Sequence, residues 1–272
     1  MKPRSQSPMR ALLAPRRDIP QWAYGVTAAA SFVAAVAVWW WFSHRPGTNP
    51  VFIPTPERVW AGGWELWRDG NMRADVGASF LRVGYGFLLS AAIALPLGLL
   101  MGAYRIAEAW LQPLTEFIRY IPVPALVPVL MIFFGIGELS KVMLIFIGTF
   151  FQLVLMVADE TRRVPYELVQ VSYTLGASRR EVLPLVLLRG AMPGIFDAMR
   201  LCHGWAWSYV IVAEFVAATE GLGYRTLKYY RFLQSPKIWF YLLLLGCIGL
   251  ALDLLFRAAG RRLFHWADTS KR

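Results

Sequence analysis

The stretch Val164–Pro193 reads VPYELVQVSYTLGASRREVLPLVLLRGAMP and lies between two strongly apolar segments of this 272-residue chain. Leu168, Val171 and Leu175 recur at i, i+3 and i+7, which is the spacing of one face of an α-helix. Pro165 suits the first position of that helix, because the N–H that proline lacks has no helical partner there. The first half of the stretch is therefore predicted to form a short helix with one apolar face.

The second half of the stretch carries the signals of a sharp turn and a new helix. Gly176 follows the last apolar position, where helices commonly end on a residue with a left-handed backbone. Ser178 and Glu181 form the S-x-x-E pattern of a capping box, which begins a second helix. Two short helices held between apolar segments suggest a compact docking surface for a soluble partner.

The rest of the chain is apolar enough to belong in a membrane. Hydrophobic residues make up 57% of it and aromatic residues 15%, with a mean hydropathy of +0.45. In the second apolar run, Gly98 and Gly102 form a G-x-x-x-G face suited to close helix contact. Because apolar runs of near-membrane length recur, we expect an all-α membrane protein with about six transmembrane helices, over residues 22–42, 83–103, 120–134, 142–158, 201–219 and 238–252.

The net charge of +11 is distributed in a way that indicates membrane topology rather than nucleic-acid binding. Six spans place both termini on one side, together with the loop at about residues 160–192. Most of the basic residues lie on that side, which the positive-inside rule assigns to the cytoplasm. We therefore expect both termini in the cytoplasm and no nucleic-acid partner.

The basic leader over residues 1–20 is similar to the start of a secretory signal peptide, but the apolar run after it is too long. That run ends in Trp39–Trp41, which indicates an interfacial anchor rather than a small-residue cleavage site. We therefore expect an uncleaved first span, a membrane domain over residues 21–265 and a cytoplasmic tail over residues 266–272.

Five ionisable side chains lie inside or near the apolar runs. A charge at the bilayer centre costs about 2.5–3.5 kcal/mol, so each is expected to have a partner or to face water. Asp253 has Arg257 one helical turn away, which predicts a local ion pair. The five are Arg119, Arg200, His203, Glu214 and Asp253.

Two of these charges, Arg200 and Glu214, are candidates for the solute pathway or for gating. Arg200 lies at the start of the fifth span, where its side chain could also simply extend to the membrane surface. Glu214 lies about 20 Å further along the same span. It could cap the turn at Gly221–Gly223 or line a cavity, and both interpretations stay open.

The predicted outer side has two further features. Residues 59–67 place three tryptophans at helical spacing, as in a helix lying on the membrane surface or in a docking ledge for a receptor. Arg225, Lys228 and Arg231 lie at i, i+3 and i+6, on one side of a helix. These three cations would either raise the local concentration of anions or form a solvated rim.

The stretch around Gly176 resembles the cytoplasmic EAA loop of ABC-importer permeases. Gly176 matches the glycine of that pattern, and Ala177–Ser178 matches the residues that usually follow it. The chain departs from the pattern where Gln170–Ser172 replaces Glu-Ala-Ala and where Leu188–Arg189 replaces Leu-Pro. The wider chain resembles the nitrate, sulfonate, taurine and bicarbonate branch of these permeases, in the stretches Phe52–Pro56, Phe134–Lys141, Val212–Glu214 and Gly221–Gly223.

This resemblance implies the type I ABC-importer permease fold over residues 21–265, in the bacterial cytoplasmic (inner) membrane. It implies a homodimer that binds ABC ATPase subunits inside and a periplasmic or extracellular substrate-binding protein outside, within membrane lipid, with no cofactor and no metal. The dimer would import a small solute such as nitrate, taurine, an alkanesulfonate or bicarbonate by alternating access. The residues expected to couple it to the ATPase are Glu167, Gln170, Val171, Ser172, Leu175, Gly176, Ala177 and Ser178.

The chain lacks the sequence motifs of an enzyme. It contains no G-x-x-x-x-G-K-[ST] sequence, so ATP hydrolysis by a P-loop would have to come from a separate subunit. It also contains no H-E-x-x-H or G-x-S-x-G motif, so we expect no catalytic residues. A secondary transporter, which would need inverted repeats, and a membrane-embedded enzyme remain the alternatives.

Overall fold

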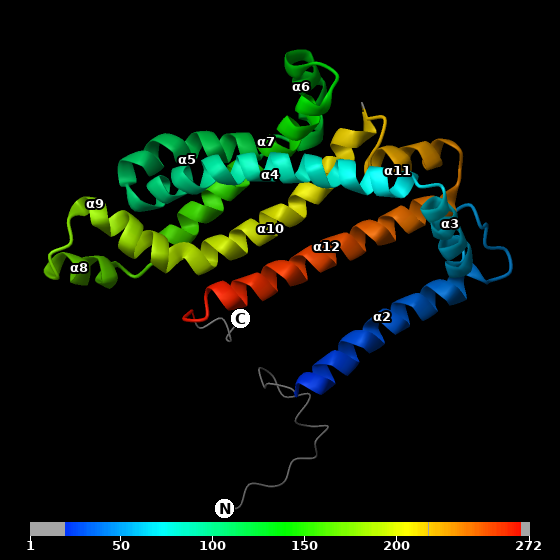
Figure 1. The fold of residues 1–272 in the computed structure, drawn as a ribbon, viewed down its shortest axis with the longest axis horizontal. Coiled ribbons are helices and arrows are strands. Elements are labelled where there is room, and N and C mark those ends of the chain that lie inside the picture. The colour runs from blue at the N-terminus through cyan, green and yellow to red at the C-terminus, as the bar shows by residue number, and fades with distance from the viewer. Residues whose placement is uncertain (1–19, 217, 268–272) are drawn as a thin grey trace, which may run out of the picture.

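The computed structural model describes residues 20–216 and 218–267, and every regular element within them is helical (Figure 1). The predicted leader and most of the predicted tail lie outside the described residues. The elements are α2 Gln21–Ser43, α3 Pro56–Arg68, α4 Asn71–Ala103, α5 Arg105–Arg119, η1 Val123–Leu126, α6 Val127–Phe134, α7 Glu138–Arg162, α8 Tyr166–Thr174, α9 Arg179–Val182, the π-helical turn η2 Leu183–Leu187, α10 Leu188–Phe215, α11 Leu222–Arg231 and α12 Ser235–Leu263.

Helices α4 and α7 form the centre of the bundle, and small residues bring them together. A side chain at Gly86 would collide with Ile145, and one at Gly98 would collide with Val157. Gly102 approaches the α7 backbone in the same way near Ala158. The predicted G-x-x-x-G packing face is therefore confirmed. Since ascending positions in α4 meet ascending positions in α7, the two helices run parallel.

Two consecutive parallel helices require the chain to return across the bundle between them. That return is made by α5 and the segment η1–α6, which meet at an angle of 89° (Figure 1). Pro122 and Pro124 lie at the bend, where proline lacks an N–H donor and disfavours helix in the residue before it. Within the described residues, five helices are long and apolar enough to cross a membrane, and this bent pair makes the sixth crossing.

The third predicted span, over residues 120–134, was therefore wrong in its bounds. The crossing begins at Arg105 and is broken, rather than running as one short apolar helix. The other predicted spans each fall largely on one helix, although α4 and α10 begin well before the apolar runs and α12 ends well after its run. In α4 the extra length carries Asp75 and Arg82. Both side chains are buried, and each has an oppositely charged partner that compensates its charge.

The remaining helices run alternately along the bundle. Gly194 of α10 meets Glu160 near the end of α7, whereas Tyr209 meets Gly148, so α10 is antiparallel to α7. Helix α12 returns antiparallel to α10, and the end of α2 meets the start of α12, where Trp39 stacks on Trp239 at 5.2 Å between ring centroids. The start of α2 and the end of α12 therefore point toward the end of the bundle that carries α8 and α9 (Figure 1).

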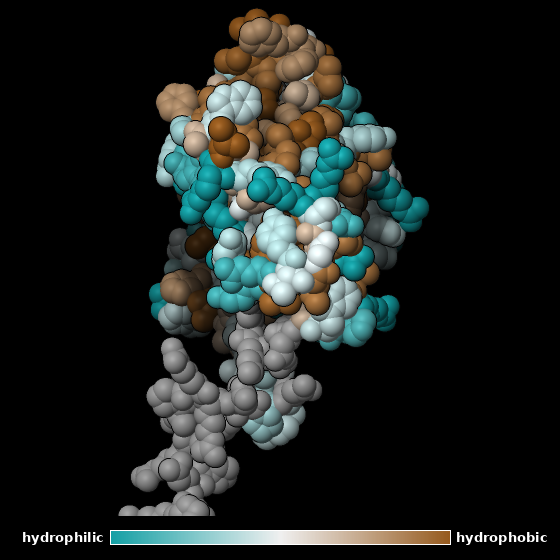
Figure 2. All heavy atoms as spheres, turned by 90° about the vertical axis from the view of Figure 1, so that its left-hand side faces the viewer, coloured by the Kyte–Doolittle hydropathy of each residue, from teal (hydrophilic) through white to brown (hydrophobic). Residues whose placement is uncertain are grey.

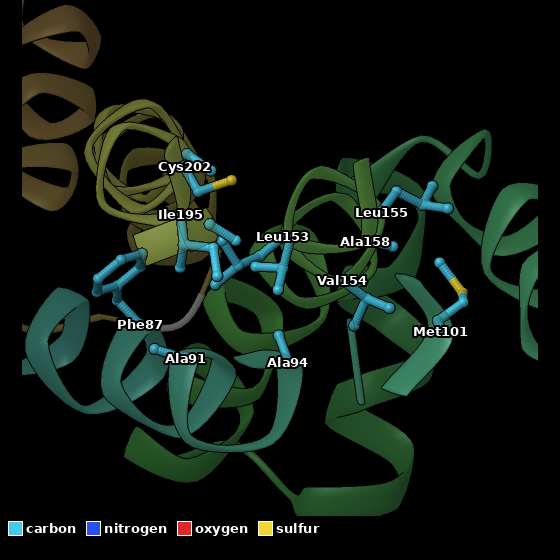
Figure 3. Packing of buried hydrophobic residues seen from close by; sticks show 13 residues of the cluster. Phe87, Ala91, Ala94, Met101, Leu153, Val154, Leu155, Ala158, Ile195 and Cys202 are labelled. Carbon is cyan, nitrogen blue, oxygen red and sulfur yellow. The ribbon is translucent and has the colours of Figure 1, made fainter. Parts of the chain in front are cut away.

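The main core lies between α4, α7 and α10 (Figure 3). Phe87 and Ala94 of α4 pack there against Leu153 of α7 and against Ile195 and Cys202 of α10. The outer surfaces are also apolar, as expected for helices that face lipid. Figure 2 views the molecule from the end with α8 and α9, where hydrophilic side chains gather below a hydrophobic flank.

Candidate functional site

The first candidate region is the coupling loop, defined here as α8, the turn at residues 175–178 and α9. Helix α8 ends in a Schellman motif, in which the N–H of Ala177 donates to the carbonyl of Ser172 at 3.0 Å. The N–H of Gly176 donates to Tyr173 at 3.0 Å, and Gly176 has φ +89°. The predicted left-handed glycine is confirmed.

Helix α9 begins with the predicted capping box. The carboxylate of Glu181 accepts hydrogen bonds from the N–H of Ser178 at 2.8 Å and from its hydroxyl at 2.7 Å. Pro165 precedes the first helical residue, Tyr166, instead of occupying that position. After α9 the chain continues through η2 into α10 without a break, so the second helix of the loop is the start of a long span.

The coupling loop exposes the apolar face that its sequence predicts. No residue of α8 is buried, and Leu168, Val171 and Leu175 are 50%, 54% and 83% exposed. An apolar stripe at the hydrophilic end of a membrane bundle is a surface suited to a protein partner. All the predicted coupling residues lie on α8 or the turn after it, namely Glu167, Gln170, Val171, Ser172, Leu175, Gly176, Ala177 and Ser178.

The second candidate region is a buried charge cluster at the opposite end, centred on Glu214. This residue is 1% exposed, and its carboxylate accepts hydrogen bonds from Ser79 at 2.7 Å and Arg82 at 2.8 Å. Its other oxygen accepts from the N–H of Gly223 at 2.8 Å. Glu214 thus caps the turn before α11, which is one of its two predicted alternatives.

Arg82 joins this cluster to the start of α7. Its Nε and Nη2 donate to the two oxygens of Glu138 at 2.6 and 2.8 Å, and its Nη1 also donates to the carbonyl of Glu220 at 2.8 Å. Lys141 adds a further contact to Glu138 at 2.7 Å. One guanidinium therefore ties α4 to α7, α10 and the segment before α11.

Asp75 completes the cluster and changes the interpretation of Arg225. The buried Asp75 carboxylate accepts from the N–H of Gly221 at 2.9 Å and from Arg225 at 2.7 Å. Arg225 is therefore neutralised, and its expected role as a free outer cation was wrong. Among the described residues, Lys228 and Arg231 form no ion pair, so they remain candidates for that role.

The residues of this cluster on α4 were missed by sequence reasoning. Asp75, Ser79 and Arg82 lie just before the apolar run at residues 83–103, and none of them was among the charges expected inside the membrane. Their i, i+4 and i+7 spacing places them on one helical face, and this signal could have identified them. A charged stripe continuous with an apolar span predicts partners on the neighbouring helices.

Arg200 and Glu214 are not brought together. They are separated by about 21 Å along α10. Arg200 donates to Asp253 of α12 at 2.6 Å instead of extending alone to the membrane surface. Asp253 also pairs with Arg257 at 2.7 Å, which confirms the predicted local ion pair.

A cavity of about 200 Å³ lies where α5 bends into η1, against α7 and α10. Its lining includes Arg119, Gln152, Trp205 and Tyr209, whose side chains carry polar groups, and the other lining residues are apolar. Over residues 20–216 and 218–267, no three His, Cys, Asp or Glu side chains are grouped to hold a metal ion.

Comparison with known proteins supports a transport role. Residues 94–265 match the family described as binding-protein-dependent transport system inner membrane component. A probable ABC transporter permease protein of Brucella abortus strain 2308 is 34% identical over 88% of this chain and 94% of its own length. The taurine transport system permease protein of Escherichia coli K12 is 30% identical over 85% of this chain and 86% of its own length.

The fold itself has a solved counterpart. One chain of the methionine ABC transporter MetNI, in an inward-facing conformation, superposes with a TM-score of 0.60. The match covers 70% of this chain and 97% of that chain, at 22% sequence identity. At this identity the likeness concerns the arrangement of the helices.

Proposed function

The chain belongs to the family of binding-protein-dependent transport system inner membrane components, and we propose that it moves a small oxyanion inward by alternating access. It is the permease subunit of an ABC importer, with the type I importer fold and several membrane spans. ATP is hydrolysed by a separate ATPase subunit, and a substrate-binding protein supplies the solute to such a system.

The substrate class is proposed from the relatives. Proteins similar to this chain over 65–86% of its length are named as permeases for taurine, aliphatic sulfonates and bicarbonate. These solutes differ in size but share a compact group of negatively charged oxygens. We propose nitrate, taurine, an alkanesulfonate or bicarbonate as the solute of this chain.

The coupling loop is the proposed contact with the ATPase. Its apolar stripe, Leu168, Val171 and Leu175, would be buried by that partner, and burial of apolar side chains is favourable by about 25 cal/mol per Å². The loop is continuous with α7 on one side and α10 on the other. Movement of the ATPase would therefore be transmitted directly to two helices of the core.

The buried charge cluster and the Arg200 ion pair are the proposed gating elements. Glu214 and Arg82 would hold the outer ends of α4, α7 and α10 together, so that these helices move as one body. The pair of Arg200 and Asp253 would link α10 to α12 nearer the coupling loop. Alternating access would then arise from movement between two copies of this rigid unit in a homodimer.

The proposed orientation places the coupling loop and both termini in the cytoplasm, as the excess of basic residues indicates. In a variant without Cys202 and Cys247, a cysteine at Ser5 or Ser270 should resist membrane-impermeant thiol reagents in intact cells. A cysteine at Asn71, at the start of α4, should react. Labelling at the two termini but not at residue 71 would reverse the orientation.

The exposed stripe of α8 carries this proposal, and the Gly176→Asp variant tests it. Aspartate at φ +89° strains the turn by about 1–2 kcal/mol and disturbs the Schellman motif that orients α8. We expect the permease in the membrane at its normal level, with at least a severalfold loss of copurified ATPase and of ATP-dependent uptake.

The matched control is Gly47→Asp, because Gly47 has φ +90° and, like Gly176, no neighbour within 4 Å of an added Cβ. This variant carries similar backbone strain in a loop at the other end of the bundle. Normal ATPase binding by Gly176→Asp would reject the coupling assignment. Uptake that continues without ATP would instead favour a secondary transporter.

A further inference from the structure

The cavity at the bend of the broken span is partly open to the outside of the monomer and lies about halfway along the length of the bundle. Gly148 and Gln152, which line it from α7, are about 15 and 21 Å along a helix that is about 37 Å long. Arg119 ends α5 at the same place, and η1 follows after the bend. Irregular backbone at such depth is tolerated where protein buries it or where it lines a water-filled space.

Over residues 20–216 and 218–267, Arg119 forms no ion pair, and Glu116 on the same helix is hydrogen-bonded to Gln112 instead. Arg200, Glu214 and Asp253 each form an ion pair with a neighbouring helix. Arg119 instead donates to the hydroxyl of Tyr120 at 3.2 Å, with its guanidinium 5.0 Å from the centre of that ring. A guanidinium at mid-depth is costly unless water or an anion meets it.

The other polar groups of the wall suit the same kind of ligand. Gln152 has an amide N–H₂, Trp205 an indole N–H and Tyr209 a hydroxyl, and all three can donate hydrogen bonds to oxygen. The cavity wall contains no carboxylate to repel an anion. The planar fork of arginine matches the oxygens of an oxyanion better than a point charge does.

The size of the cavity suits a ligand of a few heavy atoms. Its volume of about 200 Å³ is far above the roughly 10–15 Å³ that one water needs. It is below the roughly 300–1,000 Å³ of sites for drug-sized ligands. A small oxyanion with part of its water shell fits these limits.

We propose that this cavity is a solute site within the permease itself, where Arg119 binds the charged oxygens of a small oxyanion on its way across the membrane. The proposal rests on the proposed import function and adds a substrate-binding residue to it. Selection would then occur twice, first in the substrate-binding protein and again at the break between α5 and η1.

The test is uptake by the complete complex of permease, ATPase and substrate-binding protein in liposomes, with labelled nitrate, taurine and bicarbonate as probes. Arg119→Gln should lower kcat/KM for uptake about ten- to hundredfold, because it removes a charge-assisted hydrogen bond at the site. Arg119→Lys should restore much of kcat with a raised KM, since the charge returns without the fork. Arg105→Gln, at the exposed start of the same helix, is the control and should transport normally.

A second readout separates binding from structure. ATPase activity stimulated by the loaded binding protein should stay within about twofold of wild type in Arg119→Gln, since docking and coupling do not involve the cavity. A parallel loss of stimulated ATPase activity and uptake would indicate a structural role and overturn the site. If Arg119→Gln fails to accumulate in the membrane, Arg119→Lys becomes the deciding variant. An unchanged KM for uptake by Arg119→Lys would also overturn the proposed site.

The failure of this proposal can be distinguished from the failure of the proposed function. Wild-type uptake of a probe together with equal uptake by Arg119→Gln would reject the site and leave anion import standing. Wild-type complexes that take up none of the probes with ATP would reject the anion substrate, and the ligand class of this cavity with it.

Discussion

The coupling loop and the buried charge cluster lie at opposite ends of the same bundle and are built in opposite ways. The loop is held by bonds between residues three to five positions apart, such as Ala177 to Ser172 and Ser178 to Glu181. The cluster is held by bonds between residues that are far apart in sequence, with 132 positions between Arg82 and Glu214. The loop exposes its apolar side chains, whereas the cluster buries the charges of Asp75, Arg82 and Glu214.

This difference indicates a division of labour between the two ends. A loop with its own caps can keep its shape while its surface engages a partner. A cluster that ties four segments together makes those segments move jointly, because separating them would leave buried charges unpaired. The following variants test whether the loop depends on local contacts and the cluster on long-range contacts.

The largest effect is expected from Glu214→Ala in the charge cluster. It leaves Arg82 buried with part of its charge unpaired and frees the N–H of Gly223, at a cost of about 3 kcal/mol in the free energy of unfolding. Denaturant unfolding of the purified permease in detergent would measure this loss. Asp159→Ala in α7 is the control, because the Asp159 side chain is 60% exposed and its partner Arg162 keeps a second carboxylate at Glu108, so its removal should cost no more than about 1 kcal/mol.

An intermediate effect is expected from alanine at two glycines that share a left-handed backbone. Gly221 has φ +122°, and an added Cβ would collide with the Glu214 carboxylate. Gly176 has φ +89° and open space around it. Gly221→Ala should therefore cost clearly more than the roughly 1–2 kcal/mol of backbone strain expected for Gly176→Ala. Equal losses of stability would show that the cluster tolerates displacement of Glu214.

The last comparison concerns the three outer cations of α11, among which Lys228 and Arg231 should give the smallest effects. Arg225→Gln removes the ion pair of buried Asp75 and should lower stability by about 1–3 kcal/mol, with no specific dependence of uptake on salt. Lys228→Gln with Arg231→Gln should leave stability unchanged and slow anion uptake a few-fold at low salt only. Unfolding curves and uptake at several ionic strengths separate the two. A salt-dependent defect in Arg225→Gln alone would reverse the assignment.

Most of the fold could be predicted from the sequence, because apolar run length and helix spacing are local properties. The helical class, the count of six crossings and the packing glycines of α4 were predicted correctly. The third span was placed wrongly, since the apolar run at residues 120–134 concealed a bend that prolines impose. Whether a proline-rich run bends or crosses the bundle as one helix depends on the neighbouring helices. Here α4 and α7 run parallel, so the chain between them must cross back over the bundle.

The candidate sites also separate into features that local sequence predicts and features that depend on contacts between distant helices. The turn at Gly176 and the capping box at Ser178 were predicted because their signals lie within a few residues of each other. The partners of Glu214 on α4 were missed, and Arg225 was misjudged, because both depend on which helix faces which. Charge in a sequence shows that a partner is needed, but not where the partner lies.

The sequence by itself determined the helices, their caps and the exposed face of the coupling loop, since these depend on short-range hydrogen bonds and helical periodicity. Only the tertiary structure decided which charges are neutralised and which face a cavity. Arg82 and Arg119 look alike in sequence, as arginines beside an apolar run. Packing surrounds Arg82 with two carboxylates and leaves Arg119 against a cavity, because the electrostatic energy of a charge depends on neighbours that the fold brings from distant positions.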